Sequence, residues 1–376
     1  MIHYLLRRFL KMKRLLSVLI TAALLLSLSS CVTARDSAQE YLENEIRGMN
    51  FSGVILVTKN GQVVCQKASG MEKTPFLSPV SLDTLFCVGS VSKQFAAAAV
   101  MLLQEDGKLS VNDRLSRFFP DYAYGKDLTV HNLLSMRSGI TEFYGVTYID
   151  DAFTEIPTND LEGIITNQAT PAENKAKLEQ WLFRQPLDFE PDTEGAYSNS
   201  NYFLLARIVE CVSEKSYNDF VRERIFEPLG MNHSVFIDDV DLQTLPHLAA
   251  PSVNPKTVYV GVTMGLGDII TNARDMDKWL TSFRTHKLLS AESVSAMMTD
   301  YSREGEIDSE YGYGLIPDRK GGAYHNGYIT TYYSMDYCSP EQGINLFAVT
   351  NDDVGLKGSL NEVCWGVLDR ISDTAQ

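Results

Sequence analysis

Ser90 and Lys93 are the two residues whose types and spacing point most directly to chemistry. They form the only Ser-x-x-Lys in the chain, and apolar residues follow at helical spacing to about Glu105, where Gly107 is placed to end a helix. Residues three apart share a helix face, so the lysine amine can approach the serine hydroxyl and take its proton. Backbone N–H groups of the first turn can bind an oxyanion. The pair predicts a nucleophilic serine. The alternative interpretation is an ordinary helix start with an exposed lysine.

A phenol and an amide follow about a hundred residues later, in Tyr197-Ser198-Asn199. This segment is part of a polar loop that leads into an apolar helical run, Phe203 to Val212. If the loop is extended, the side chains of Tyr197 and Asn199 point the same way and can meet one substrate. Ser198, Asn199 and Ser200 are also good helix N-caps, which is the alternative interpretation.

The third motif is His325-Asn326-Gly327, the only His-x-Gly in the chain. It precedes a strand-like run, Tyr328 to Tyr337. An ordinary strand histidine and a glycine bulge are the alternatives for this motif.

In this order the three motifs resemble the penicillin-recognising serine hydrolases: β-lactamases, penicillin-binding proteins and their esterase and peptidase relatives. The Tyr-Ser-Asn and His-Asn-Gly forms look like the class C β-lactamase and family VIII esterase branch. The resemblance covers most of the chain from Phe51 to Leu368. It extends to these connecting phrases: Phe51-Ser52-Gly53, His131-Asn132-Leu133-Leu134-Ser135, Ser138-Gly139, Phe226-Glu227-Pro228-Leu229-Gly230-Met231 and Tyr313-Gly314-Leu315.

The resemblance implies roles for the motif residues. Ser90 attacks a carbonyl, Lys93 and Tyr197 share the removal of its proton, and His325 completes the catalytic set. Substrate-binding positions are Asn199, Asn326, Gly327 and Tyr328, with the backbone N–H groups of Ser90 and Tyr328 holding the oxyanion.

Three positions depart from the family pattern. His325 stands where many relatives carry lysine, Thr331 where many carry glycine, and Tyr328 is bulky beside the expected oxyanion site. A histidine near pH 7 is largely neutral, so recognition of a substrate carboxylate should be weak. This favours esters, neutral amides or unusual peptides over penicillins.

The expected fold class is α/β, a two-lobed α+β domain like that of the β-lactamases and transpeptidases, with a mixed sheet flanked by helices and an inserted helical lobe. A chain of 376 residues, 44% of them hydrophobic, can bury such a core. We expect strands over 53–58 and 62–67 joined at Asn60-Gly61, strands over 328–337 and 344–350, and a last helix near 360–369. The expected divisions are a signal peptide over 1–30, a tether and first helix over 31–50, and a hydrolase domain over 51–372 with its helical lobe at about 109–231. The segment 141–167 is hard to assign, and in the family such a segment often covers the site.

The first thirty residues are interpreted as an export signal and not as part of the folded domain. Five basic residues precede an apolar run from Leu15 to about Leu28, which is too short for a comfortable membrane span. The run ends in Leu28-Ser29-Ser30-Cys31, which resembles a bacterial lipobox with Cys31 as the lipidated N-terminus. A plain secretory leader with a chance cysteine is the alternative, and Met12 is a second candidate start. We therefore expect an extracytoplasmic protein anchored by lipid to the cell envelope membrane.

Charge and cysteine content exclude several classes of partner. The formal net charge of −15 becomes −20 when the five basic leader residues are removed, which disfavours nucleic acid and anionic lipid. No C-x-x-C, H-E-x-x-H or G-x-S-x-G occurs, so neither a metal site nor an α/β-hydrolase elbow is expected. No cofactor is expected, and the five cysteines after Cys31 are interpreted as mostly buried small apolar residues.

The predicted function is that of a serine hydrolase that forms an acyl-enzyme on Ser90 and cleaves a small ester, an amide or a D-amino-acid peptide bond, or a β-lactam. The alternatives are a penicillin-binding or sensor lipoprotein that acylates without turnover, and an envelope protein with a vestigial motif. Retention of Ser90, Lys93, Tyr197 and His325 together disfavours the last. Neither the substrate nor the oligomeric state follows from the sequence.

Overall fold

The fold is described from a computed structural model. It covers residues 37–73, 77–149, 152–157, 161, 164–166, 168–251, 261–303, 306, 310–351 and 357–372. The predicted leader and Cys31 lie outside these residues. Across the ranges covered, no helix combines the length and apolarity that crossing a bilayer requires.

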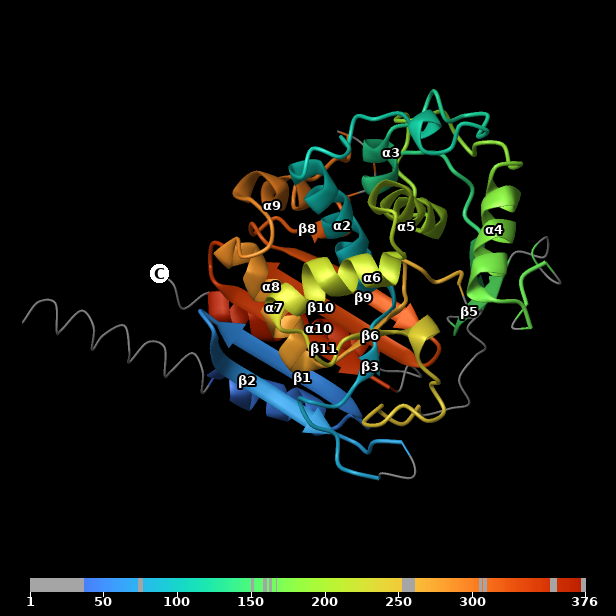
Figure 1. The fold of residues 1–376 in the computed structure, drawn as a ribbon. Coiled ribbons are helices and arrows are strands. Elements are labelled where there is room, and N and C mark those ends of the chain that lie inside the picture. Colours follow the sequence, from blue (N-terminus) through green and yellow to red (C-terminus); the bar gives the residue numbers. More distant parts are fainter. Residues whose placement is uncertain are drawn as a thin grey trace, which may run out of the picture.

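A six-stranded antiparallel sheet in the order β2-β1-β11-β10-β9-β8 is the largest element. Figure 1 shows its blue strands from the start of the chain beside red strands from the end. The predicted first hairpin is confirmed, because Asn60 and Gly61 both have positive φ, as a two-residue turn requires. The strands are β1 (Gly53–Lys59), β2 (Gln62–Ser69), β8 (Ile316–Pro317), β9 (Ala323–Ile329), β10 (Tyr332–Ser339) and β11 (Ile344–Thr350).

Helices cover both faces of this sheet. On one face the helix over residues 37–46 and α10 (Lys357–Ser372) bury apolar side chains of alternate strand positions, such as Ile55 and Met335. On the other face α2 (Lys93–Glu105) and α8 (Ala273–Thr285) pack against Leu56 and Phe347. The larger core lies on this second side, and α2 is its centre.

A helical lobe lies beside α2, and its helix α5 packs against α2 (Figure 1). Two small sheets accompany it, in the orders β3-β7-β6 and β4-β5. The remaining elements are β3 (Phe86–Cys87), η1 (Gly89–Ser92), η2 (Leu115–Arg117), α3 (Val130–Leu134), β4 (Tyr144–Ile149), β5 (Ala152–Pro157), α4 (Pro171–Leu182), α5 (Asn199–Ser213), α6 (Tyr217–Val221), η4 (Arg222–Phe226), α7 (Glu227–Leu229), β6 (Val235–Phe236), η5 (Ile237–Asp239), β7 (Ile269–Thr271) and α9 (Ala291–Met297). The expected α/β class, a sheet flanked by helices, is confirmed, but the large sheet is antiparallel throughout and not mixed.

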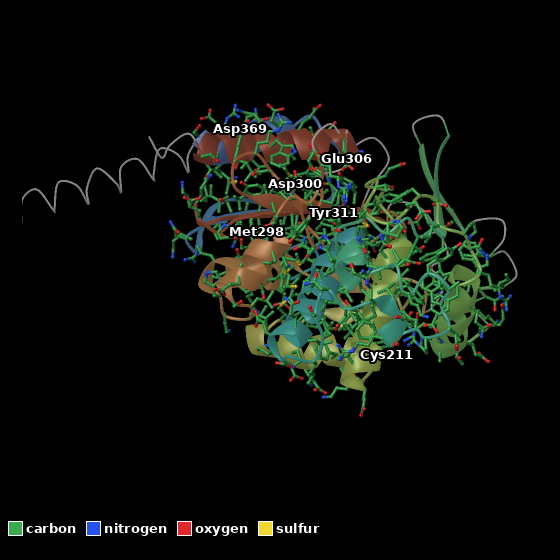
Figure 2. The ribbon with its side chains drawn as sticks, turned by 90° about the horizontal axis from the view of Figure 1, so that it is seen from above. Cys211, Met298, Asp300, Glu306, Tyr311 and Asp369 are labelled. Carbon is green, nitrogen blue, oxygen red and sulfur yellow. The ribbon has the colours of Figure 1, made fainter. Side chains whose placement is uncertain are left out.

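Two local expectations need correction or completion. The single strand expected over 328–337 is wrong, because the chain turns at Thr330, whose φ is +56°, and forms β9 and β10 on either side. The segment that was hard to assign contains the hairpin β4–β5, which projects from the molecule in Figure 2.

Candidate active site

Two glycines bring the Ser90 turn into contact with strand β9. Ser90 lies in η1, directly before α2, and Gly89 has a φ of +52°. A methyl group on Gly89 would lie 2.7 Å from the backbone nitrogen of Tyr328, and one on Gly327 would lie 1.9 Å from the carbonyl oxygen of Val88. Only glycine permits this approach. The nucleophile candidate therefore lies against the strand that carries the His-x-Gly motif.

Lys93 is fully buried and binds three oxygen atoms. Its Nζ lies 3.0 Å from Ser90 Oγ, 2.7 Å from Asn199 Oδ1 and 2.9 Å from the Leu266 carbonyl oxygen. A buried amine needs such partners, since an unpaired one would be costly. The expected approach of Lys93 to Ser90 is present, and the exposed-lysine alternative is wrong.

The partners of Lys93 define what the amine can do. The oxygens of Asn199 and Leu266 can only accept hydrogen bonds, so each uses one N–H of Lys93. The third hydrogen-bonding position of Nζ faces Ser90 Oγ. This hydroxyl can accept a hydrogen bond from an ammonium or donate one to a neutral amine. The geometry thus allows a proton to pass between the hydroxyl and the amine along one hydrogen bond.

Tyr197 lies beside this pair. Ser198 is extended, with φ −142° and ψ 120°, and the Lys93 Nζ lies 4.8 Å from the centre of the Tyr197 ring. A hydrogen bond joins the phenol to Ser90. Burial raises the pKa of the Tyr197 hydroxyl, and this effect is larger than the lowering caused by the hydrogen bond. The phenol is therefore protonated at neutral pH. The hydroxyl is the buried end of Tyr197, since the residue as a whole is 47% exposed.

The capping alternative for this loop is not supported by the contacts. Ser198 occupies the N-cap position of α5 without a side-chain cap. Its hydroxyl donates instead to the carbonyl oxygen of Ile140, 3.1 Å away.

His325 is buried and bonded at both ring nitrogens. Its Nδ1 lies 2.5 Å from the carbonyl oxygen of Asn326, which can only accept, so Nδ1 carries the proton. Its Nε2 then accepts from the hydroxyl of Tyr311 at 2.9 Å. Burial, helped by the charge of Lys93, lowers the pKa of His325 to about 3. The imidazole is therefore neutral near pH 7, as expected from its residue type.

The other motif positions do not all face the site. Asn326 and Tyr328 alternate with His325 along β9, and the Tyr328 side chain packs against the core on the opposite face of the sheet, so the expectation that it crowds the oxyanion site is wrong. Asn326 Oδ1 is buried and accepts no hydrogen bond from any residue that the structure covers. Gly327 pairs with Ser334 in a regular register, so the bulge alternative is wrong. The backbone nitrogen of Tyr328 lies next to Gly89, on the side of the Ser90 turn.

A buried carboxyl group ties the lysine helix to the histidine strand. Asp336 accepts from Gln94 Nε2 at 2.6 Å and from the His325 backbone nitrogen at 3.0 Å, and Gln94 accepts from Trp279 Nε1 at 2.8 Å. Burial raises the pKa of Asp336 to about 7. These contacts fix the position of His325 relative to Lys93.

Known proteins resemble this chain in sequence and in fold. The sequence model of the family described as Beta-lactamase matches residues 36–361. This chain belongs to the Beta-lactamase family. Penicillin-binding protein 4* of Bacillus subtilis (strain 168) is 30% identical over 76% of the chain and 64% of that protein. The teichoic acid D-alanine hydrolase of Staphylococcus aureus (strain MRSA252) is 22% identical over 89% of the chain and 80% of that protein.

The Beta-lactamase family assignment agrees with the fold. A crystal structure of the D-amino acid amidase from Ochrobactrum anthropi SV3 has a TM-score of 0.71 at 23% identity, over 92% of this chain and 100% of that one. The chain spans 64% of the length of the two Bacillus subtilis penicillin-binding relatives that it matches. The predicted family and fold are confirmed.

Three residues of this Beta-lactamase family site were missed from the sequence. Tyr311 bonds His325, Leu266 contributes only a carbonyl oxygen, and Glu142 accepts from the Asn199 backbone nitrogen and, at 3.4 Å, from Asn199 Nδ2. A backbone contact has no sequence signal. Glu142 follows the Ser138-Gly139 phrase closely, which was the one available hint. In the residues that the structure covers, no group of three His, Cys, Asp or Glu side chains could hold a metal ion.

Proposed function

We propose that this chain is a serine hydrolase that forms an acyl-enzyme on Ser90. The observation that carries the proposal is the single hydrogen bond between Ser90 Oγ and a buried Lys93 Nζ whose other two bonds are fixed. Lys93, charged at rest, must first release a proton, and in its neutral form it takes the serine proton as Oγ attacks the carbonyl carbon of the substrate. The N–H groups of Ser90 and Tyr328 hold the resulting oxyanion. Tyr197, protonated at rest, passes its proton to the leaving group and is reprotonated by Lys93, and water then releases the acyl group.

A fluorophosphonate probe tests this nucleophile. We expect one adduct on the wild type by intact mass and none on Ser90→Ala. Ser295→Ala, which removes an exposed serine of α9, is the matched control and should label normally. Absence of an adduct on folded wild-type protein would contradict the proposal. A lasting adduct with substrate and no steady-state rate would favour the alternative of a non-turnover penicillin-binding or sensor protein.

For the substrate we propose D-aminoacyl esters or amides with a free ammonium group. The site holds a neutral imidazole at His325 and a carboxylate at Glu142 beside Asn199. With Lys93 in the neutral form that the proposed mechanism requires, this arrangement attracts an ammonium and repels a carboxylate. Two relatives carry names that fit, a teichoic acid D-alanine hydrolase and a D-amino acid amidase.

A substrate panel with one substitution distinguishes these classes. We expect D-alanyl p-nitroanilide to exceed its N-acetyl form and nitrocefin in kcat/KM. Glu142→Gln should lose most of the preference for the free amine while keeping p-nitrophenyl acetate hydrolysis. Glu190→Gln, at an exposed position in the loop before Tyr197, controls for removal of one charge. A preference for nitrocefin would contradict this substrate class.

We further propose an extracytoplasmic location with a lipid anchor at Cys31, after removal of residues 1–30, and a hydrolase domain over 51–372. The support is the leader pattern and the names of relatives that contain penicillin-binding and teichoic acid. Intact mass of the membrane fraction should show a diacylglyceryl-sized increment that is lost in Cys31→Ser. Release of an unmodified mature protein would instead indicate a plain secretory leader.

A further inference from the structure

Two loops meet beside the proposed nucleophile. The Tyr197 loop, residues 187–198, belongs to the helical lobe. The Tyr311 loop, residues 299–315, precedes β8; residues 304, 305 and 307–309 of it lie outside the described part of the chain. The ring centres of Tyr197 and Tyr311 are 6.0 Å apart, and Tyr311 holds His325. The relative placement of the loops therefore sets the distance between the two phenols.

One buried guanidinium binds a carboxylate from each loop. Only 2% of the Arg137 side chain is exposed. Its Nη1 and Nη2 donate to Glu306 of the Tyr311 loop at 2.7 and 2.9 Å, while Nε donates to Asp192 of the Tyr197 loop at 2.9 Å. Figure 2 labels both Glu306 and Tyr311 of the Tyr311 loop. The planar fork of arginine makes such a double contact possible.

Two backbone hydrogen bonds and a second ion pair also hold the two loops together. The Arg137 carbonyl oxygen accepts from the Asp192 nitrogen at 2.8 Å, and the Met136 carbonyl oxygen accepts from the Ala196 nitrogen at 2.9 Å. On the outer side Arg303 binds the second oxygen of Asp192 at 2.6 Å. Arg137 itself follows α3, so a third element carries the charge that joins the two loops.

We propose that Arg137 is a positioning residue of the active site, which holds Tyr197 and Tyr311 at their working distance by binding Asp192 and Glu306. Asp192 is five residues before Tyr197, and Glu306 is five residues before Tyr311. Loss of either carboxylate contact loosens one loop relative to the other, because the link between them that then remains, the ion pair of Arg303 with Asp192, is about half exposed. The catalytic consequence rests on the serine hydrolase function proposed above.

The test compares substitutions along this connection with a remote one. Arg137→Met removes the charge, Arg137→Lys keeps the charge without the fork, and Glu306→Gln keeps the shape of the partner. Arg224→Met is the matched control, because Arg224 binds Asp106 with two nitrogens at the far end of α2. Both kcat and KM for p-nitrophenyl acetate are measured, together with hydrogen exchange of peptides covering the two loops.

We expect kcat to fall about 100-fold in Arg137→Met and about 10-fold in Glu306→Gln, with smaller changes in KM, since misplacement of about 1 Å has such costs. Arg137→Lys should recover part of the loss. Exchange should quicken in both loops in the Arg137 and Glu306 variants, and kcat and loop exchange should stay unchanged in Arg224→Met. If Arg137→Met does not fold, Glu306→Gln decides alone.

Two results would overturn the inference: an unchanged kcat in folded Glu306→Gln, or faster exchange confined to the Tyr311 loop. An inactive wild type in which the exchange of both loops responds to Glu306→Gln would refute the hydrolase function and leave the connection between the loops established. The two proposals can therefore fail separately.

Discussion

Acid should destabilise the folded protein through His325, by an amount that one substitution can isolate. The folded-state pKa of this buried histidine is about 3, and the unfolded chain has the ordinary value of about 6.5. Between pH 6.5 and pH 3, His325 is protonated in the unfolded state but stays neutral in the folded state. Its contribution to stability is therefore complete above pH 6.5 and is lost as the pH falls toward 3.

The magnitude at pH 5 follows from the unfolded-state value alone, provided that the folded histidine stays neutral there. A difference of about 1.5 pH units at about 1.4 kcal/mol each gives a loss of about 2 kcal/mol. Asp336 and Asp268 act in the opposite direction, because burial raises their pKa values to about 7 and about 8 and the folded state binds their protons more tightly. The difference between wild type and a histidine variant is thus the informative quantity.

The assay is urea unfolding at pH 7 and pH 5 for the wild type and His325→Asn. An asparagine amide can replace Nδ1 as donor to the Asn326 carbonyl oxygen and takes up no proton. We expect the wild type to lose about 2 kcal/mol more than the variant between the two pH values. His286→Asn is the control, since His286 is exposed in a left-handed conformation that asparagine tolerates. Equal pH dependence in wild type and His325→Asn would refute the neutral, buried histidine.

Three more outcomes follow from the site and the core. Gly89→Ala should lower kcat by about 100-fold or more, measured by ester hydrolysis, because the added methyl group would displace β9 from the Ser90 turn; normal activity would exclude that contact. Tyr311→Phe should lower the unfolding free energy by about 1–3 kcal/mol in urea titrations, because His325 Nε2 loses its donor inside the protein. In the domain after Cys31, a thiol reagent should modify exposed Cys211 first, and reductant should leave the melting temperature unchanged, since the five described cysteines are free.

The site segments that could be predicted each carry a local signal. Ser90 and Lys93 are joined by helical spacing, and Asn60-Gly61 is a turn of known geometry. The loop at Tyr197 precedes an apolar helix, and these features do not depend on the rest of the chain. The approach of His325 to the other three was expected only from the family resemblance, and the fold brings the four together.

The features that could not be predicted depend on contacts between distant segments. Tyr311, Glu142 and Asp336 have ordinary sequence surroundings and gain their significance from what the fold places beside them. The turn at Thr330 was missed because a β-branched residue disfavours the left-handed conformation, so the local sequence favours a continuous strand. Arg137 lies between two of the connecting phrases, and the sequence carries no signal of its burial.

The position of β1 between β2 and β11 has a consequence for synthesis of the protein. Gly53 of β1 pairs with Thr350 of β11, so β1 can form this pairing only after almost three hundred more residues have been synthesised. Such long-range pairing slows folding. A ribosome-bound chain that already contains every proposed catalytic side chain would still lack the middle of its largest sheet, so truncation shortly after residue 329 should yield an insoluble product.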